Sequence, residues 1–414
     1  MTDPLAGLAD ELDGRLAGVD EWLRSSYPGD RGVRQPVHTV YVPADRFDAG
    51  TVAAWGEQAR AALGRYGASA GELADGIGLD LALVKDVLDL VRAKLAAEPV
   101  EDLRIDFEDG YGNRPDDEED AAVLGAAAAL REVLDGPGPK PAYYGIRFKS
   151  FEAPTRRRGL RTLGLFVSAL GPLGDGFVVT LPKVTAVEQV SAMVSALERL
   201  EDAVGVGPLR FEIQVETPQS ILGADGTALV ARMIHAADGR CSGLHYGTYD
   251  YSASCGIAAE YQSMEHPAAD HAKAVMQVAA AGTGVFLSDG STNVIPVGSA
   301  DEVRAAWVLH ARLVRRSLER GFYQGWDLHP AQLPTRFLAT FAFYRHGLPQ
   351  AAARLAAYVG GSGGAGFLDE PATAAALAGF VMRGLECGAV DEAEVEQLAG
   401  IDRERLSGLA RRSG

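Results

Sequence analysis

The sequence predicts a single (β/α)8 TIM barrel with a helical insertion after its first strand and a helical C-terminal extension. Three observations predict this α/β fold: eight short apolar runs, helical patterns that follow most of them, and a length of 414 residues, which a barrel with insertions can reach. Strands that alternate with helices of this length form βαβ units, so we expect a parallel sheet. Eight strands favour closure into a barrel.

The chain opens with an amphipathic helix. Apolar residues recur between Leu5 and Leu23 at spacings of three and four positions, which is the period of one helical face. Pro28 and Gly29 then end the helical pattern. The first apolar run follows shortly afterwards and is closed by Pro43.

The predicted strands and helices alternate along most of the chain. The eight apolar runs lie at 38–42 (HTVYV), 103–107 (LRIDF), 143–148 (YYGIRF), 177–181 (FVVTL), 211–215 (FEIQV), 242–246 (SGLHY), 284–288 (GVFLS) and 322–326 (FYQGW). Helical patterns lie at 117–134, 156–170, 186–200, 218–236, 266–281 and 301–320. In such a barrel the chemistry is carried by the loops at the carboxyl ends of the strands. The residues that follow each run are therefore the candidates for function.

Two segments fall outside this alternation. Residues 48–102 hold two or three helices where one crossover helix is sufficient, so we interpret them as an insertion that covers the barrel wall. Residues 334–414 are mostly helical and are interrupted by the glycine-rich run 360–366 (GGSGGAG), which is flexible by composition. The predicted domains are thus a barrel over 1–333, including the insertion, and an extension over 334–414 that can pack on a neighbouring subunit.

The composition excludes several classes of partner. A net charge of −17 argues against nucleic acid and anionic membranes, because both are polyanions. No run of about 18 apolar residues could span a bilayer, and the acidic N-terminal segment lacks the features of a signal peptide, so we expect a cytoplasmic protein. Cys241, Cys255 and Cys387 form no CxxC pair, which favours buried, unreactive thiols.

Acidic residues gather where the predicted strands end. Asp106, Glu108 and Asp109 follow the second run, and Glu216 and Asp250 follow the fifth and sixth. Neighbouring strands lie about 4.8 Å apart, so the last two carboxylates can meet. They would repel unless one is protonated or a cation lies between them. We favour Mg2+ over an acid–base dyad, and Mn2+ is the alternative metal. Zinc is disfavoured because no histidine pair or thiolate cluster has ligand spacing.

Three basic residues each have two interpretations. The guanidinium of Arg147 matches a substrate carboxylate or enolate oxygen, but an ion pair with Glu108 or Asp109 is equally consistent with the sequence. Lys183 follows a proline and is expected to stabilise charge on the substrate rather than to form a Schiff base. His329 precedes a proline, and a structural hydrogen-bonding role is favoured over that of a base.

In their order and placement, these motifs resemble the HpcH/HpaI aldolase–citrate lyase β-subunit superfamily of phosphoenolpyruvate/pyruvate-binding barrels. The resemblance runs from about Val40 to Pro371, except for the insertion. The matching pieces are Tyr41-Val42-Pro43, Asp106-Phe107-Glu108-Asp109, Arg147, Leu181-Pro182-Lys183, Glu216-Thr217-Pro218, Gly247 to Asp250, Asp289-Gly290 and His329-Pro330-Ala331-Gln332. Each piece is weak alone, but together they are specific.

The resemblance implies a Mg2+-dependent carbon–carbon lyase that forms the enolate of a 2-oxo acid or acyl thioester. It assigns Glu216 and Asp250 as metal ligands, and Arg147 as the residue that holds the carbonyl and carboxylate oxygens of a small anionic substrate. It assigns Glu108 and Asp109 as the acids that order metal-bound water.

The resemblance also extends to the C-terminal extension. The segment 367–371 (FLDEP) resembles a motif that, in the citrate-lyase-like branch, supplies an aspartate to a neighbouring subunit, so we expect a homo-oligomer such as a trimer in which Asp369 acts in trans. A helix N-cap is an equally consistent role for this residue. For the general base we favour Asp369 or a metal-associated water over His329.

The sequence also departs from the family pattern. Phe148-Lys149-Ser150 follows Arg147 where the family usually has Asn, and the loop around Thr248, which we expect to contact substrate, is bulkier than usual. These differences and the insertion indicate an uncharacterised branch and leave the substrate and any coenzyme A requirement open. The competing functions are a malate-synthase-like Claisen condensation, hydrolysis of an acyl thioester, and a non-catalytic metabolite-binding barrel.

Overall fold

The computed structural model of the protein describes residues 5–67, 69–360 and 370–411. Its strands are β1 (His38–Pro43), β2 (Asp102–Asp106), β3 (Tyr143–Arg147), β4 (Val178–Leu181), β5 (Arg210–Val215), β6 (Cys241–Tyr246), β7 (Phe286–Ser288) and β8 (Gly325–Asp327). All neighbours pair in parallel, in the order β7-β6-β5-β4-β3-β2-β1-β8. A further parallel bridge from Ser288 to Gln324 links β7 to the residue before β8 and nearly closes the barrel. The predicted fold is confirmed.

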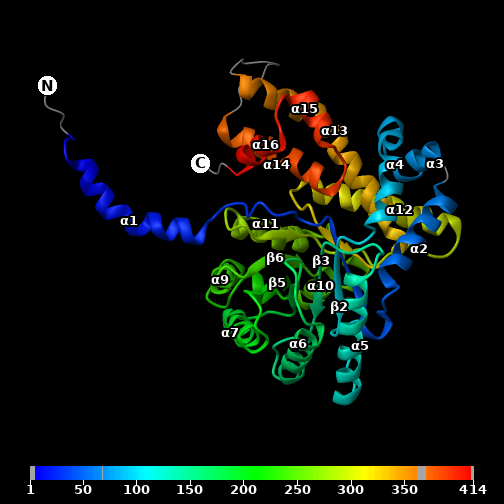
Figure 1. The fold of residues 1–414 in the computed structure, drawn as a ribbon, viewed down its shortest axis with the longest axis horizontal. Helices are drawn as coiled ribbons and strands as arrows, with labels where there is room; N and C mark the ends of the chain where they lie inside the picture. The colour runs from blue at the N-terminus through cyan, green and yellow to red at the C-terminus, as the bar shows by residue number, and fades with distance from the viewer. Residues whose placement is uncertain (1–4, 68, 361–369, 412–414) are drawn as a thin grey trace.

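Helices cover the outside of the barrel (Figure 1). They are α5 (Asp116–Asp135), α6 (Arg156–Leu170), α7 (Val187–Val204), α8 (Pro218–Ile221), α9 (Leu229–Ala236), α10 (Thr248–Ser254), α11 (Pro267–Ala280) and α12 (Ala300–Glu319). Every residue of β2, β4 and β6 is buried. β2 alternates apolar Leu103 and Ile105 with charged residues, and the ion pairs of Arg104 with Asp102 and Glu212 compensate these buried charges.

One predicted helix is divided in two. The pattern at 218–236 forms the short α8 and then α9, with a turn between them. Gly226 adopts a positive φ of 80°, and the Asp225 carboxylate accepts hydrogen bonds from the backbone N–H and the hydroxyl of Thr227. An aspartate that binds the backbone two residues ahead, followed by a glycine in the left-handed region, favours a turn over a continuous helix.

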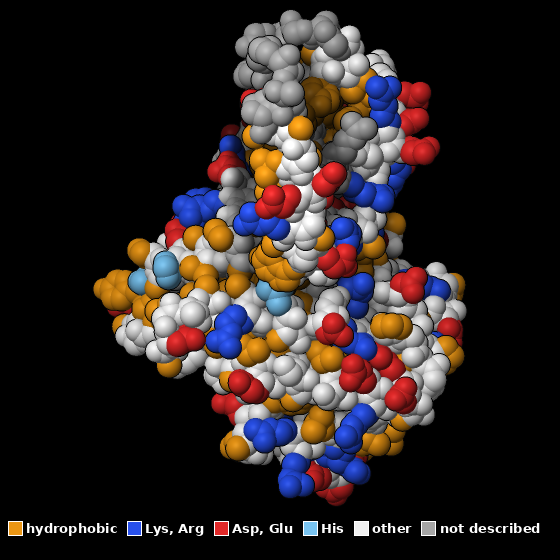
Figure 2. All heavy atoms as spheres, turned by 90° about the vertical axis from the view of Figure 1, so that its left-hand side faces the viewer, with side chains coloured by type: hydrophobic (Ala, Val, Ile, Leu, Met, Phe, Trp, Pro, Cys, Tyr) orange, Lys and Arg blue, Asp and Glu red, His pale blue; other side chains and the backbone are white. Residues whose placement is uncertain are grey.

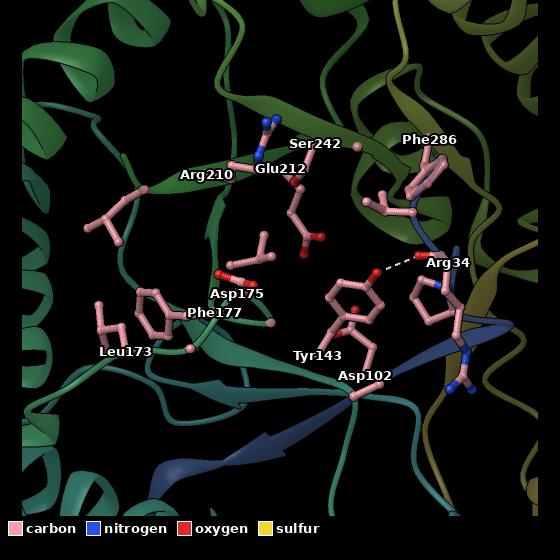
Figure 3. Close-up of a pocket in the computed structure, with 18 of the residues that line it drawn as sticks. Arg34, Asp102, Tyr143, Leu173, Asp175, Phe177, Arg210, Glu212, Ser242 and Phe286 are labelled. Atoms are coloured by element: carbon pink, nitrogen blue, oxygen red, sulfur yellow. Dashed lines mark hydrogen bonds between the residues drawn. The ribbon is translucent and has the colours of Figure 1, made fainter. Parts of the chain in front are cut away.

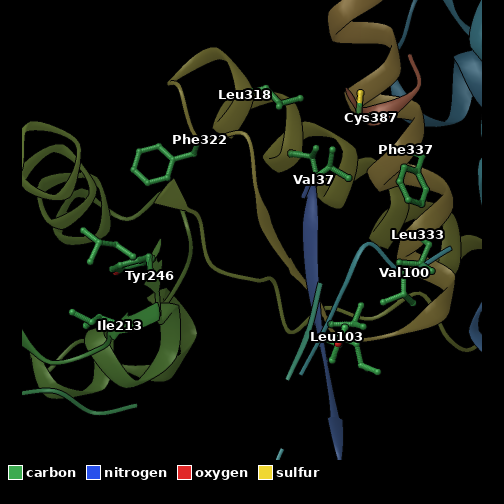
Figure 4. Packing of buried hydrophobic residues seen from close by; sticks show 14 of the residues in the cluster. Val37, Val100, Leu103, Ile213, Tyr246, Leu318, Phe322, Leu333, Phe337 and Cys387 are labelled. Carbon is green, nitrogen blue, oxygen red and sulfur yellow. The ribbon is translucent and has the colours of Figure 1, made fainter. Parts of the chain in front are cut away.

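The insertion and the C-terminal extension form a helical layer beside the barrel. The insertion holds α2 (Thr51–Tyr66), α3 (Ala70–Ile77) and α4 (Leu81–Ala97), and the extension holds α13 (Leu333–Gly360), α14 (Pro371–Cys387), α15 (Glu392–Ala399) and α16 (Arg403–Ala410). α13 packs against both α4 and α12 of its own chain. Figure 4 shows Leu333 and Phe337 of α13 near Val100, in the same buried apolar cluster that continues into the barrel.

The three cysteines differ in burial, and the N-terminal helix lies outside the barrel. Cys241 and Cys387 are buried, and burial raises the pKa of each thiol to about 12, but Cys255 is exposed, so its expected burial was wrong. The N-terminal helix α1 (Leu8–Ser26) projects away from the body (Figure 1). Within the described part of the chain, no helix combines the length and apolarity needed to cross a membrane.

Candidate functional site

The predicted site residues gather at the carboxyl ends of five consecutive strands. Glu108 follows β2, Arg147 ends β3, Lys183 follows β4, Glu216 follows β5, and Asp250 lies in the first turn of α10 after β6. This is the end of the barrel that carries chemistry in proteins of this fold.

Lys183 lies among the acidic residues. Its ammonium is 2.7 Å from Glu108 Oε1, 2.7 Å from Asp109 Oδ2 and 3.6 Å from Asp250 Oδ2, and its backbone N–H donates to Glu216 Oε1 at 2.7 Å. Burial alone would lower the pKa of Lys183, but the carboxylates around it, led by Glu216, outweigh burial and raise it. The side chain therefore stays an ammonium, which is consistent with charge stabilisation and not with a Schiff-base amine.

Glu216 is a buried carboxylate held in a tight space. A Cβ atom on Gly247 would lie 2.5 Å from its Cβ and 2.9 Å from its Oε2, so only glycine leaves room for this side chain. Burial raises the pKa of Glu216 to about 8, although Lys183 and Arg147 act in the opposite direction. Burial likewise raises the pKa of Glu108. Two buried acids at one end of the barrel are costly unless a cation or hydrogen-bond donors compensate them.

Asp250 and Thr248 belong to the same short helix but differ in their environment. The Asp250 side chain is 48% exposed, so one of its oxygens is accessible to a ligand. The Thr248 hydroxyl is buried and has no hydrogen-bond partner in the described chain. A Cβ on Gly290 would lie 2.0 Å from this hydroxyl oxygen, so glycine is also required after β7. An unpartnered buried hydroxyl at this position has hydrogen-bonding capacity for a ligand.

Arg147 forms an ion pair with Asp106, a partner that was not predicted from the sequence. Its Nε and Nη2 bind the two oxygens of Asp106 at 2.7 Å each, whereas its Nη1 lies 3.5 Å from both Glu108 Oε2 and Gln214 Oε1. Asp106 also accepts the backbone N–H groups of Glu108 and Gly110. The Nε–Nη2 edge of the guanidinium is thus held in a structural ion pair with Asp106, and Nη1 faces Glu108.

The other predicted residues are placed differently. His329 is half-buried and caps the short helix η3 (Pro330–Gln332), where its Nδ1 accepts the Ala331 N–H at 3.1 Å. This contact is the structural role that the sequence favoured. Asp369 lies outside the described residues. Among those that are described, no three His, Cys, Asp or Glu side chains converge to form a complete ligand set.

Two polar residues in the motifs are engaged elsewhere. Lys149 pairs with Glu119 at 2.6 Å and donates to the Phe107 carbonyl at 2.8 Å. Asp289 is buried and accepts from the Lys273 ammonium at 2.9 and 3.0 Å. Both pairs fix the ends of strands and helices around the site.

Comparison with protein families identifies the chain. A family model described as a domain of unknown function (DUF6986) matches residues 16–413. The chain belongs to this family. No curated protein matches this DUF6986 protein in sequence.

Solved structures share its fold. A citrate lyase from Burkholderia xenovorans LB400 superposes with a TM-score of 0.60 at 17% identity, and the alignment covers 88% of this chain and 96% of that one. A malate synthase from Haloferax volcanii is 14% identical with a TM-score of 0.48, covering 93% and 99% of the two chains. An HpcH/HpaI aldolase/citrate lyase family protein from Burkholderia cenocepacia J2315 is 14% identical with a TM-score of 0.41, covering 76% and 94%. The superposition on the citrate lyase shows the barrel fold that the sequence predicted.

A large cavity of the DUF6986 protein lies at the opposite end of the barrel. It has a volume of about 810 Å3 and is lined by residues at the amino ends of the strands, such as Asp102, Tyr143 and Arg210 (Figure 3). Its inner wall is a buried ion-pair cluster in which Arg104 binds Asp102 and Glu212. In barrels of this fold the amino ends of the strands serve stability rather than catalysis, so size alone does not make this cavity the reaction site.

Proposed function

We propose that this protein is a Mg2+-dependent carbon–carbon lyase that cleaves or forms a bond next to the carboxylate of a 2-oxo acid or hydroxy acid. The observation that carries the proposal is a pair of carboxylates, Glu216 and Asp250, at the ends of consecutive strands around Lys183. Glu216 is buried in a space that only glycine at position 247 leaves open, and Asp250 is accessible.

The residues fit a divalent cation with oxygen ligands. Mg2+ is held by one or two carboxylates and completes its shell with water and substrate oxygens, so a full set of protein ligands is not required. Glu216 and Asp250 would hold the ion, and Mn2+ would bind through the same oxygens. When bound, the cation polarises a carbonyl and stabilises the negative charge that develops on its oxygen.

The protein's own side chains supply the remaining roles that we propose. Arg147 directs Nη1 toward the site, where it binds the carboxylate or carbonyl oxygen of the small anionic substrate. Lys183 adds positive charge, and the unpartnered Thr248 hydroxyl donates to a substrate oxygen. Glu108 and Asp109 accept hydrogen bonds from Lys183 and orient water near it.

The proton acceptor is the least constrained of these roles. His329 uses the lone pair of Nδ1 to accept the Ala331 N–H, so in the neutral ring Nε2 carries the proton and neither nitrogen is left to accept another. Burial lowers the pKa of this histidine, which favours that neutral form. We therefore assign the base to an ordered water or to Asp369, which a neighbouring subunit would contribute in a homo-oligomer.

Calorimetry tests the metal site directly. Titration with Mg2+ should give one site per chain, which Glu216→Gln and Asp250→Asn abolish or weaken by about tenfold or more, since each removes a charged ligand. Asp175→Asn, an exposed acid at the opposite end of the barrel, is the matched control and should bind as the wild type does. Wild-type affinity in both ligand variants would refute the metal assignment.

A substrate panel tests the reaction class. We would incubate the protein and Mg2+ with 2-oxo and hydroxy acids, with and without acyl-CoA, and identify the products by mass spectrometry. Cleavage of a carbon–carbon bond supports the lyase. Condensation of an acyl-CoA with an oxo acid supports a malate-synthase-like enzyme, thioester cleavage alone supports a hydrolase, and metal-dependent binding without turnover indicates a metabolite-binding barrel.

A further inference from the structure

The guanidinium of Arg147 has one nitrogen that no short contact holds. Asp106 binds Nε and Nη2 at 2.7 Å each, whereas Nη1 lies 3.5 Å from both Gln214 Oε1 and Glu108 Oε2. Hydrogen bonds of this length are weak, so these two contacts can be exchanged for a substrate oxygen. The pair with Asp106 fixes one edge of the planar group but still lets the plane tilt about that edge. Other groups must therefore set the direction of Nη1.

The aromatic ring of Tyr41 limits this tilt. Arg147 Cζ lies over the ring, 4.8 Å from its centroid, which is within the distance at which an aromatic face attracts a cation. The other neighbour of Tyr41 is Trp326, with 4.6 Å between the two ring centroids. Tyr41 is therefore packed between a guanidinium and an indole, and neither ring contact leaves room for the guanidinium to swing toward β1.

Gln214 joins Arg147 to the hydroxyl of the same tyrosine. Its Nε2 donates to Tyr41 Oη at 3.4 Å, and its Oε1 faces Arg147 Nη1. A side-chain amide has one donor end and one acceptor end, so donation to Tyr41 leaves the acceptor end toward the guanidinium. The reverse orientation would place N–H donors of both residues against each other. The Tyr41 hydroxyl thus orients the amide that faces Nη1.

These contacts cross the interior of the barrel. Tyr41 lies on β1, Arg147 on β3 and Gln214 on β5, and these strands are not neighbours in the sheet. Tyr41 is 9% exposed and Gln214 is 0% exposed, so neither contributes to the mixed apolar and charged surface that Figure 2 shows. A change in either side chain therefore acts inside its own barrel and not through contact with another molecule.

We propose that Tyr41 and Gln214 are positioning residues for Arg147, which hold Nη1 toward the site so that it binds one oxygen of the anionic substrate. The inference rests on the proposed function, because it takes Arg147 as a residue that binds the substrate. It adds that Arg147 presents a single nitrogen and not a bidentate fork, since Asp106 already occupies the Nε–Nη2 edge. Other groups of the site must then bind the remaining substrate oxygens.

Calorimetry with oxalate at saturating Mg2+ tests the inference. Oxalate has adjacent oxygens like those of a 2-oxo acid and cannot undergo the reaction. Tyr41→Phe removes only the hydroxyl, and Gln214→Met removes the amide but keeps an unbranched side chain. Each should weaken oxalate binding by about three- to tenfold, the effect of one weak hydrogen bond, while Mg2+ affinity stays near that of the wild type. Gln35→Met, at a glutamine before β1 whose amide donates to the Leu287 carbonyl, is the matched control and should bind oxalate as the wild type does.

A double-mutant cycle shows whether both residues act through Arg147. The chain with both changes should bind oxalate about as weakly as the more affected single variant, because residues that act on one group are not additive. In an Arg147→Lys chain, Tyr41→Phe should change oxalate affinity by less than about twofold. If Arg147→Lys does not fold, the cycle between Tyr41 and Gln214 decides alone.

The outcomes separate this inference from the proposed function. Oxalate binding that depends on Arg147 but is unchanged in both Tyr41→Phe and Gln214→Met would overturn the inference and leave the proposed function standing. Fully additive effects, or an equal effect of Tyr41→Phe in the Arg147→Lys chain, would overturn it as well. A wild type that binds no oxalate with Mg2+, or binds it as well after Arg147→Lys, would refute the substrate-binding role of Arg147 and both proposals with it.

Discussion

Replacing Gly247 by alanine isolates the steric support of the candidate metal site. Gly247 has a φ of −95° and a ψ of 93°, a conformation that alanine can adopt, so the substitution introduces no backbone strain. The new methyl group would lie 2.5 Å from the Glu216 Cβ and 2.9 Å from its Oε2, distances that non-bonded atoms do not adopt. Either the carboxylate or the loop between β6 and α10 must therefore move.

The expected magnitudes follow from this displacement. Overpacking a tight site costs about 1–3 kcal/mol, and the reduced freedom of the unfolded chain offsets about 0.4–1 kcal/mol. We therefore expect a loss of about 1–2 kcal/mol in the free energy of unfolding, measured with urea. A misplaced ligand should also weaken Mg2+ binding by about tenfold or more in calorimetry. Gly125→Ala, in α5 with open space around it, is the control and should leave both quantities unchanged or stabilise the fold. An alanine variant that binds Mg2+ with wild-type affinity would refute the steric argument.

Three further substitutions test the charges. Arg147→Lys keeps the charge but loses the planar fork, so turnover should fall while Mg2+ affinity stays near that of the wild type; an unfolded variant would show that its ion pair is purely structural. Lys183→Met removes an ammonium 3.6 Å from Asp250 and should strengthen Mg2+ binding several-fold in calorimetry, and weaker binding would contradict this. Burial alone would raise the pKa of Glu101, but Lys94 and a neighbouring arginine lower it to about 2. The ionised group thus stabilises the fold above about pH 4.3, and this contribution, up to about 3 kcal/mol, is lost as the pH falls toward 2. Glu101→Gln should flatten that acid-side loss in urea unfolding, and an unchanged pH profile would refute it.

The barrel could be predicted because most of its strands hold two or more buried apolar residues and alternate with helical patterns. The rule that chemistry lies at the carboxyl ends of the strands then selects Glu216, Asp250 and Lys183 without knowledge of the pairing. Each of these site residues could therefore be predicted separately. The hydrogen bond from the Lys183 backbone N–H to Glu216 could not, because every residue except proline has such an N–H and the sequence does not show which carboxylate it meets.

The partner of Arg147 was missed because it depends on strand register. Asp106 and Arg147 are paired residues on β2 and β3, so their side chains point the same way, whereas Glu108 lies beyond the end of the strand. The sequence places all three acids of 106–109 near one another and cannot rank them. Aligning the two runs so that their last residues match would have pointed to Asp106. The turn between α8 and α9 could also have been predicted, because the segment Gly-Ala-Asp-Gly at 223–226 is typical of a turn.

Lys183 has an unusual backbone conformation that no sequence motif predicts. Its φ of 52° lies in the left-handed region, which costs an ordinary residue about 1–2 kcal/mol. In this conformation its N–H donates to Glu216 while its ammonium donates to Glu108, so one residue joins acids that follow two different strands. A glycine would adopt the same backbone without strain but would lose the ammonium. A lysine in this strained conformation is therefore better explained by the charge that it brings to the site than by the stability of the turn.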